Sequence, residues 1–434
     1  MHNRRIAALI ALWALAFLPA CTPVNSLMPT PTIYEGPGAR PIFAGAFAAN
    51  PPRVLDLLYV TDREPITGSG GELAYGTTRS RVMTFGSLPL AIEGEDGKAG
   101  GAVAPGLFKL GSPRMIGAFP QTPYSVRKVA GGFTRDSAVV KEHAAAVRAL
   151  QAEVSRRLAN AQRKEVVIFI HGYNNTFDDA AYSTGNICRF LGAEFVCVVL
   201  SWPAGGSSGV FMGYNVDRES GEFAVADMRK AIRAIGETNG IARMHIIAHS
   251  RGTDVTASAL QQLGIESYAM KSSLSQRLKI NNVVLASPDI DIDIAASKIL
   301  TIASDPNLPF GATPRPSGVF SQGDIHLSIY SSPNDKALGM SGLLFGSVLR
   351  LGQLDPTKRA AEMAQAPPEL GGLVDFIEFT GSTNFLGHNY FLSDPQVSAD
   401  IVGLIRYRLK AGDPGRPLVE NKRLFWRIAA AQAR

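Results

Sequence analysis

The chain has 434 residues, of which 46% are apolar and 18% are charged. A chain of this size and composition can bury a full hydrophobic core, which excludes an intrinsically disordered protein. The formal net charge is only +6, and neither a basic run nor an alternation of basic and aromatic residues occurs, so we expect no nucleic-acid partner.

The N-terminus predicts an export signal. Arg4 and Arg5 precede an uncharged apolar stretch, residues 6–18, which is too short to span a membrane but has the length of a secretory core segment. This stretch ends in Leu-Pro-Ala-Cys, which resembles a bacterial lipobox with Cys21 as the acylated residue. We therefore expect a signal peptide over residues 1–20 and a lipid-anchored protein of the outer membrane, facing the periplasm or the exterior. The alternative is a plain signal peptide and a soluble periplasmic or secreted protein.

Composition divides the rest of the chain. Residues 21–52 are rich in proline and lack periodicity, which predicts an extended tether behind the lipid anchor. The folded body should span residues 53–412, with insertions at about 93–135 and 304–323 that show no readable pattern. Residues 413–434 form a C-terminal extension. Within it, "ENKRLFWRIAAAQAR" predicts a helix packed on the domain, or alternatively a basic amphipathic helix that touches a membrane.

Strands and helices alternate along the body. Two strands at 54–62 and 81–92 predict a hairpin, and a long helix over 137–162 should be capped by Asp136 or Ser137. Apolar strands then alternate with helices. The strands are expected at 165–173, 195–203, 244–250, 280–289, 325–332 and 373–380, and the helices at 176–191, 216–235, 251–263, 291–303 and 395–410. Strands that are apolar on both faces predict an α/β fold, in which helices cover both faces of a mostly parallel sheet.

Two cysteines remain besides the expected acylation site. Cys188 falls on a predicted helix and Cys197 on the strand that follows it. An exported protein can join such a pair, but the sequence does not fix their separation. Two buried free thiols are therefore the expectation, and a disulfide is the alternative.

The stretch A-H-S-R-G, residues 248–252, lies where a strand meets a helix. It is a G-x-S-x-G pattern with Ala248 in place of the first glycine. Small residues flank the serine in this pattern because the turn is tight and strained. Functional groups of a parallel sheet collect beyond the carboxyl ends of its strands. The stretch therefore predicts Ser250 as a nucleophile, and an ordinary strand-to-helix turn is the alternative.

A serine hydroxyl needs a base to accept its proton. Among the seven histidines, His388 directly follows the last strand of the predicted parallel sheet and completes the order Ser, Asp, His. A solvated loop histidine is the alternative. Asp335 follows a strand between the other two and is the expected acid, which would orient the imidazole. Asp289, one strand earlier, is the rival, although it could instead cap the next helix.

An oxyanion site needs backbone amides that are held in place before reaction. One donor should be the amide of Arg251, at the start of a helix. The other should come from the loop His171-Gly172-Tyr173, where Gly172 permits unusual backbone angles and the Tyr173 amide is the expected donor. A simple polar turn is the alternative interpretation of this loop.

With these residues the chain resembles the α/β-hydrolase superfamily, and more narrowly a bacterial group of α/β-hydrolases classed as a domain of unknown function. The resemblance spans roughly residues 54–410 and rests on the motif order. Its motifs are "LLYVTDREP", "YGTTRS", "TFGSLPL", "FIHGYNNTFDDA", "LSWPAGG", "IIAHSRGTDV", "VVLASPDIDID", "YSSPNDKALGMS" and "GHNYF". It implies the fold of that superfamily and matches Ser250, Asp335 and His388 to its triad. Arg251 replaces the methionine or similar residue often found there, so its cation could change substrate preference.

Together these features predict a serine hydrolase that cleaves carboxylic esters through an acyl-enzyme. The substrate would be a small-molecule or lipid-like ester, and neither a metal nor an organic cofactor is expected. An acyltransferase or an amidase would use the same residues, because a triad does not identify its acyl group. A non-catalytic envelope-binding protein that keeps the fold is the alternative outside enzymes.

Overall fold

The computed structural model describes residues 24–36, 38–94, 106–206, 210–304, 325–345, 349–354, 372–381 and 388–428. The expected signal peptide and Cys21 lie outside these residues, as does most of the expected insertion at 304–323. The strands are β1 (Val54–Thr67), β2 (Leu73–Glu93), β3 (Leu107–Leu110), β4 (Arg114–Ala118), β5 (Val126–Val129), β6 (Gly132–Arg135), β7 (Glu165–Ile170), β8 (Val196–Ser201), β9 (Arg243–His249), β10 (Ile280–Ala286), β11 (His326–Ser331), β12 (Val374–Glu378), β13 (Leu418–Lys422) and β14 (Phe425–Ile428).

The helices lie between these strands, with short 3₁₀ turns at Thr32–Tyr34, Gly45–Phe47 and Leu351–Gln353. The helices are α2 (Ser137–Asn160), α3 (Phe177–Phe190), α4 (Val210–Gly236), α5 (Gly252–Ala269), α6 (Leu274–Leu278), α7 (Ile292–Ser304), α8 (Lys336–Phe345), α10 (Tyr390–Ser393) and α11 (Pro395–Ile405). Asp136 caps α2, as predicted, by accepting a hydrogen bond from the Ala138 amide.

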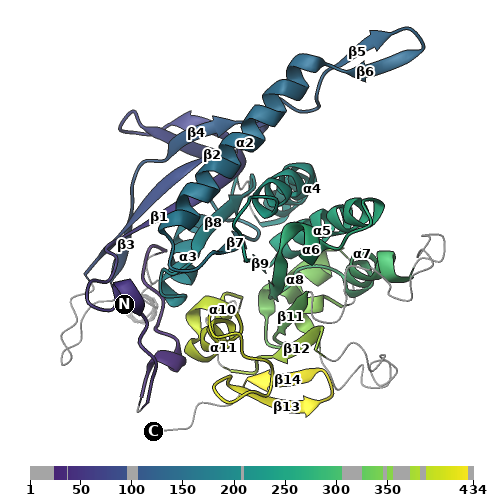
Figure 1. Cartoon of the computed structure of the whole chain (residues 1–434). Coiled ribbons are helices and arrows are strands. Elements are labelled where there is room, and N and C mark those ends of the chain that lie inside the picture. Colours follow the sequence, from purple (N-terminus) through teal and green to yellow (C-terminus); the bar gives the residue numbers. More distant parts are fainter. Residues whose placement is uncertain are drawn as a thin grey trace, which may run out of the picture.

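One twisted sheet organises the molecule (Figure 1). Its strand order is β13-β14-β12-β11-β10-β9-β7-β8-β1-β2-β3, and β4 also pairs with β2. The central strands from β12 to β1 pair in parallel, whereas β1–β2 and β13–β14 are antiparallel. The predicted α/β architecture with an N-terminal antiparallel hairpin is therefore confirmed.

The apolar strands divide the core into two layers. Along β7, Val166, Ile168 and Ile170 join the layer beneath α2, α4 and α5, whereas Val167 and Phe169 join the layer beneath α3, α10 and α11. Successive side chains of a strand point to opposite faces, so a strand buried on both faces must be apolar throughout. This requirement explains the continuous hydrophobic runs in the sequence.

Two segments differ from the prediction. Residues 107–135, expected to be an irregular insertion, form four strands, of which β3 and β4 extend the main sheet and β5 and β6 form a separate hairpin. The C-terminal extension, expected to be a helix, forms β13 and β14 instead. Phe425 and Ile428 are buried, and β14 pairs in parallel with β12. An open sheet edge and aromatic side chains favour a strand at this place over a helix.

The proline-rich segment also differs from an extended tether over its described part. Leu27 is buried, the Tyr34 hydroxyl donates a hydrogen bond to the Phe190 carbonyl at 2.5 Å, and Arg406 Nη1 donates to the Ile42 carbonyl at 2.7 Å. These bonds fix the segment against α3 and α11. The lack of periodicity in the sequence indicates that it is not a regular element, but does not indicate whether it is docked.

Cys188 and Cys197 form a disulfide, so the expectation of free thiols is wrong. The bond joins α3 to β8, and the two Cα atoms lie 6.0 Å apart.

In the described part of the chain, no helix combines the length and the apolar character needed to cross a bilayer.

A buried carboxylate, Glu165, joins neighbouring elements at the amino end of the sheet. Glu165 on β7 accepts hydrogen bonds from His245 Nε2 at 3.0 Å and from Arg408 Nη2. Burial alone would raise the pKa of Glu165, but His245 and Arg408 lower it to about 2. A carboxyl group with a lowered folded pKa stabilises the fold above its unfolded pKa, and this contribution is lost as pH falls toward the folded pKa.

Glu165→Gln is expected to lower the free energy of unfolding at pH 7 by roughly 1–2 kcal/mol, because it removes the carboxylate that His245 and the half-exposed Arg408 contact. The difference from wild type should shrink as pH falls from 4.5 toward about 2, since protonation then removes the same charge. Urea denaturation at a series of pH values measures it. Glu237→Gln, which breaks a surface pair with Arg277, is the control and should have little effect. A difference that stays constant with pH would contradict the assignment.

Candidate active site

Ser250 occupies a strained turn between β9 and α5. Its φ angle is +53°, in the left-handed region that a serine rarely adopts. The turn is held by hydrogen bonds from the Ser250 amide to the Ala286 carbonyl at 3.0 Å, and from the Asp289 amide to the Ser250 carbonyl at 3.2 Å. Such strain persists only where neighbouring structure enforces it, and it aims the side chain outward from the end of the strand.

Two glycines allow this turn to pack. A β-carbon on Gly252 would lie 2.2 Å from the His171 carbonyl oxygen. A β-carbon on Gly172 would lie 2.6 Å from the β-carbon of Ser250 and 3.2 Å from its Oγ. Only glycine fits such approaches, so the loop after β7 lies directly against the Ser250 side chain. The geometry explains why the sequence has small residues around the serine.

His388 and Asp335 form a hydrogen-bonded pair at the same edge of the sheet. The distance from His388 Nδ1 to Asp335 Oδ2 is 2.8 Å, and Asp335 is 1% exposed. The other carboxylate oxygen, Oδ1, accepts a hydrogen bond from the Leu338 amide in the first turn of α8 at 3.2 Å. This arrangement suits the Asp335 carboxylate to hold the imidazole with Nδ1 protonated.

The backbone of His388 is fixed beside the nucleophile. Its carbonyl accepts hydrogen bonds from His249 Nε2 at 3.0 Å and from Ser287 Oγ at 3.1 Å, and the rings of His249 and His388 lie 4.8 Å apart. Burial and the neighbouring His388 lower the pKa of His249 to about 3. His249 is therefore neutral at neutral pH and places no like charge beside His388.

Asp289, the rival acid, lies in a different network. Its carboxylate accepts hydrogen bonds from the Tyr214 hydroxyl and from Ser341 Oγ, the latter at 2.8 Å, and Arg350 Nε lies 3.4 Å away. Asp289 is buried and supports the nucleophile turn through its backbone amide. The structure thus pairs His388 with Asp335, and commits the side chain of Asp289 to other partners.

The loop that carries Tyr173 is held by a residue that the sequence did not single out. Asp217 on α4 accepts hydrogen bonds from the Asn174 amide at 2.9 Å and from the Gly205 amide at 3.2 Å. Asn174 has a φ angle of +56°, so the carboxylate stabilises an unusual backbone conformation next to Tyr173. The Tyr173 ring also packs on Tyr214, with 5.1 Å between the ring centroids.

Arg63 holds the carbonyl side of the same loops. Its guanidinium donates to the Asn175 carbonyl at 2.7 Å, the Ala204 carbonyl at 2.8 Å and the Gly76 carbonyl at 3.1 Å. Arg63 is fully buried. Burial lowers its pKa to about 10, although Asp62 and Asp217 act to raise it. Arg63 and Asp217 together fix both loops, and we call them the charged clamp. Arg63 lies in the quoted "LLYVTDREP", but only its tertiary partners reveal its task.

A family model described as "Alpha/beta hydrolase of unknown function (DUF900)" matches residues 146–408. The chain belongs to this family. The resemblance to α/β-hydrolases is thereby confirmed, while the family description leaves the substrate open.

Two solved structures are similar to this hydrolase at low identity. Esterase B from Lactobacillus rhamnosis, inhibited by a tributyrin phosphonate, is 12% identical over 54% of this chain and 71% of its own, with a TM-score of 0.28. Carboxylesterase CesB from Bacillus subtilis is 10% identical over 59% of this chain and 97% of its own, with a TM-score of 0.27. Comparison with curated proteins finds no match.

The Arg251 side chain of the hydrolase is engaged beside the site. Its Nη2 lies 2.6 Å from Asp254 Oδ2 and 3.8 Å from Glu222 Oε1. Burial alone would lower its pKa, but Asp254 and further neighbours raise it, so the guanidinium keeps its charge. Because Asp254 balances that charge, Arg251 offers a substrate less net attraction than its sequence position suggests. Its amide stands at the N-terminal end of α5.

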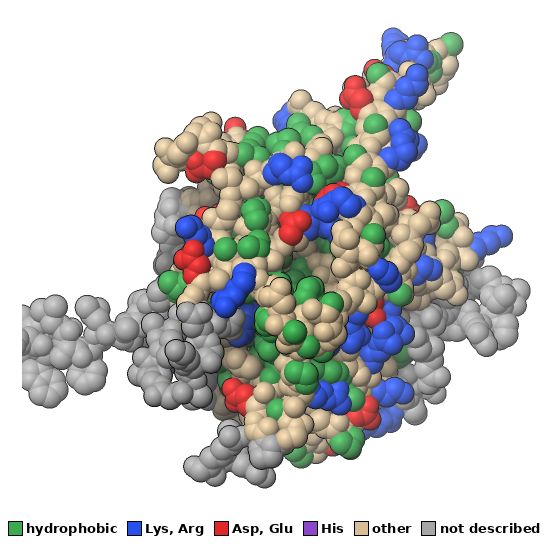
Figure 2. Space-filling model, turned by 60° about the vertical axis from the view of Figure 1, so that its left-hand side comes forward, with side chains coloured by type: hydrophobic (Ala, Val, Ile, Leu, Met, Phe, Trp, Pro, Cys, Tyr) green, Lys and Arg blue, Asp and Glu red, His purple; other side chains and the backbone are tan. Residues whose placement is uncertain are grey.

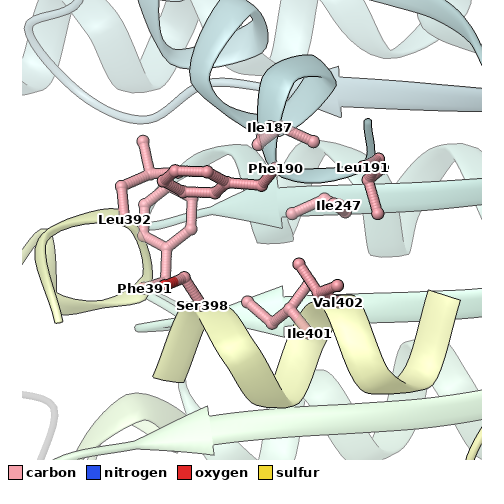
Figure 3. A pocket seen from close by; sticks show the side chains of 9 residues that line it. All are labelled: Ile187, Phe190, Leu191, Ile247, Phe391, Leu392, Ser398, Ile401 and Val402. Carbon is pink, nitrogen blue, oxygen red and sulfur yellow. The ribbon is translucent and has the colours of Figure 1, made fainter. Parts of the chain in front are cut away.

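Nine side chains line a small apolar pocket (Figure 3). Side chains from α3, β9, α10 and α11 line it, and one of them, Phe391, lies 4.7 Å from the His249 ring. Its volume is about 10 Å³. That is room for about one water molecule and too little for an acyl chain.

In the described part of the hydrolase, no group of three or more His, Cys, Asp or Glu side chains is arranged to hold a metal ion.

Arg63→Lys is expected to lower the free energy of unfolding by about 3 kcal/mol, because one ammonium group cannot serve three separate carbonyls that the planar guanidinium reaches. Hydrogen exchange should also rise at residues 172–176 and 202–206. Arg79→Lys, at an exposed arginine on β2, is the matched control and should change either quantity little. Equal effects of the two variants would show that Arg63 does not hold these loops.

Proposed function

We propose that this chain is a serine hydrolase that cleaves carboxylic esters through an acyl-enzyme. The observation that carries the proposal is the strained Ser250 turn together with the hydrogen-bonded pair of His388 and Asp335, whose His388 carbonyl is bound to His249, the residue before Ser250. Strained backbone at a nucleophile, next to an imidazole whose second nitrogen is bound to a buried carboxylate, is the arrangement that acyl transfer requires.

In the proposed reaction, Ser250 Oγ attacks the ester carbonyl while its proton passes to His388 Nε2. Asp335 holds Nδ1–H and stabilises the imidazolium. The proton then goes to the leaving alkoxide, which departs as an alcohol and leaves Ser250 acylated. Water then attacks the acyl-enzyme. His388 Nε2 accepts a proton from this water and returns it to Ser250 Oγ, and the acid product is released.

The negative charge on the carbonyl oxygen needs donors that are already in place. We assign these to the backbone amides of Tyr173 and Arg251. The contact between Gly172 and Ser250 supports this assignment, because it brings the Tyr173 loop within reach of a carbonyl bound to Ser250 Oγ. The charged clamp would keep the loop rigid, so that little reorganisation accompanies the reaction.

Ser250→Ala is expected to abolish labelling by a fluorophosphonate probe and to lower turnover of p-nitrophenyl esters by about 10⁴- to 10⁶-fold. Asp335→Asn should lower turnover by about 10⁴-fold, because the imidazole loses the partner that fixes its tautomer. Asp289→Asn is the matched control, a buried carboxyl group in the same region, and should retain labelling. Loss in Asp289→Asn without loss in Asp335→Asn would transfer the acid's role to Asp289, and full turnover in Ser250→Ala would remove the whole proposal.

We further propose that the hydrolase is exported and anchored by a lipid at Cys21. Support comes from Arg4, Arg5 and the apolar stretch at 6–18, followed by Leu-Pro-Ala-Cys. A disulfide between Cys188 and Cys197 also suits an oxidising compartment.

Cys21→Ser is expected to block incorporation of labelled palmitate and to shift the protein from the membrane fraction to the soluble fraction. The double variant Cys188→Ser/Cys197→Ser controls for loss of cysteine in general and should still incorporate the label. Unchanged membrane partition of Cys21→Ser would contradict the lipid anchor.

A further inference from the structure

The β5–β6 hairpin projects from the body of the molecule. Its strands, Val126–Val129 and Gly132–Arg135, pair only with each other, and every residue of both strands is exposed. In Figure 1 it extends beyond the N-terminal end of α2, away from the main sheet. A two-stranded ribbon without a packed face gains little stability from its own contacts. Its side chains are therefore available to a partner.

The side chains of this hairpin combine apolar and basic groups. The register pairs Val126 with Arg135 and Lys128 with Phe133, so these four side chains share one face. Val126 is 62% exposed and Phe133 is 73% exposed, the highest value for a large hydrophobic side chain among the described residues. Such exposure of an aromatic ring to water is unfavourable, and a partner that covers it would remove that cost.

The charged side chains of the hairpin are all positive. Residues 119–135 include Arg127, Lys128 and Arg135 but neither Asp nor Glu. Figure 2 shows Lys and Arg side chains along the arm that projects at the upper right. The surface is therefore complementary to an anionic partner.

The β5–β6 hairpin and Ser250 both lie toward the edge of the sheet that is formed by the carboxyl ends of its parallel strands. Only residues 161–164 separate α2 from β7, so the helix runs back along the sheet, opposite to the strand (Figure 1). A helix of 24 residues is about 36 Å long, whereas a strand of six residues is about 20 Å long. The buried residues of α2 begin only at Ala146. Its first turns therefore pass the carboxyl edge of the sheet, where Ser250 follows β9, and carry the hairpin beyond it.

We propose that the β5–β6 hairpin binds an anionic lipid surface. Phe133 and Val126 enter the headgroup region, and Lys128 and Arg135 on the same face pair with lipid phosphates. A convex arm with an aromatic tip and basic neighbours fits a soft planar surface, where aromatic rings favour the interface and cations are attracted to anionic headgroups. One consequence rests on the proposed function: docking would present the Ser250 edge to the bilayer, so the esters cleaved would be lipid-like.

Co-sedimentation with vesicles tests the binding. The protein is the full chain carrying Cys21→Ser, so that an acyl anchor cannot contribute. The vesicles contain phosphatidylcholine alone or phosphatidylcholine with phosphatidylglycerol. This protein, with no substitution in its hairpin, should partition to the anionic vesicles at least about tenfold more strongly than to the neutral ones. The partition should depend strongly on salt concentration.

Two variants separate the apolar and ionic parts of the surface. Phe133→Ser, and separately Lys128→Gln/Arg135→Gln, should each lower partition to anionic vesicles by about tenfold. The control is Val419→Ser/Lys422→Gln/Arg423→Gln, which changes one apolar and two basic residues at exposed positions of the β13–β14 hairpin and should bind as before. In Phe133→Trp, tryptophan emission should shift to the blue when anionic vesicles are added.

The outcomes are distinct. Undiminished partition of both β5–β6 variants, or no preference of the parent protein for anionic vesicles, would overturn the proposal. Binding to a single-stranded oligonucleotide as tight as to anionic vesicles, with Phe133→Ser unaffected, would show a general cationic patch and would also overturn it. Ser250→Ala should bind vesicles normally. If the parent protein, with Ser250 intact, binds anionic vesicles but fails to turn over esters, that result would count against the proposed function alone.

Discussion

The contact of the β7 and β9 loops is the constraint on which the rest of the site depends. The backbone of Gly252 lies against the His171 carbonyl, and Gly172 lies against the Ser250 side chain. These contacts leave no volume for a β-carbon, and they hold Ser250 at a positive φ angle. One close approach thus fixes both the direction of the Ser250 hydroxyl and the position of the loop that carries Tyr173.

Charge inside the fold serves mainly to hold backbone. Arg63 donates hydrogen bonds to carbonyl groups of the loops after β7 and β8, and Asp217 accepts hydrogen bonds from amide groups of the same two loops. Buried ions are costly unless their hydrogen-bonding capacity is filled, and here the backbone fills much of it. The buried ions therefore make the loops rigid, which is the property that preorganised amide donors require.

The two ends of the chain complete the fold differently from its centre. The centre is a parallel sheet covered on both faces, whereas the N-terminal residues dock on α3 and α11 through side-chain hydrogen bonds and the C-terminal residues add an antiparallel ribbon to the edge. The segment between β2 and α2 adds strands to the other edge and then leaves the body as the β5–β6 hairpin. These additions lie at the edges of the sheet, away from the carboxyl ends of β7, β9 and β10, where the site lies.

The sequence by itself determined the features that depend on local pattern. Runs that are apolar on both faces indicated the parallel strands, Asp136 indicated a helix start, and small residues around Ser250 indicated the tight turn. Tertiary structure alone decided which carboxylate contacts His388, that Cys188 meets Cys197, that residues 418–428 become strands, and that Arg63 and Asp217 hold the loops around the site. Each of these depends on the distance between residues far apart in the chain or on the space at a sheet edge. Periodicity and composition carry no such distances, because they describe only what one segment presents to its surroundings.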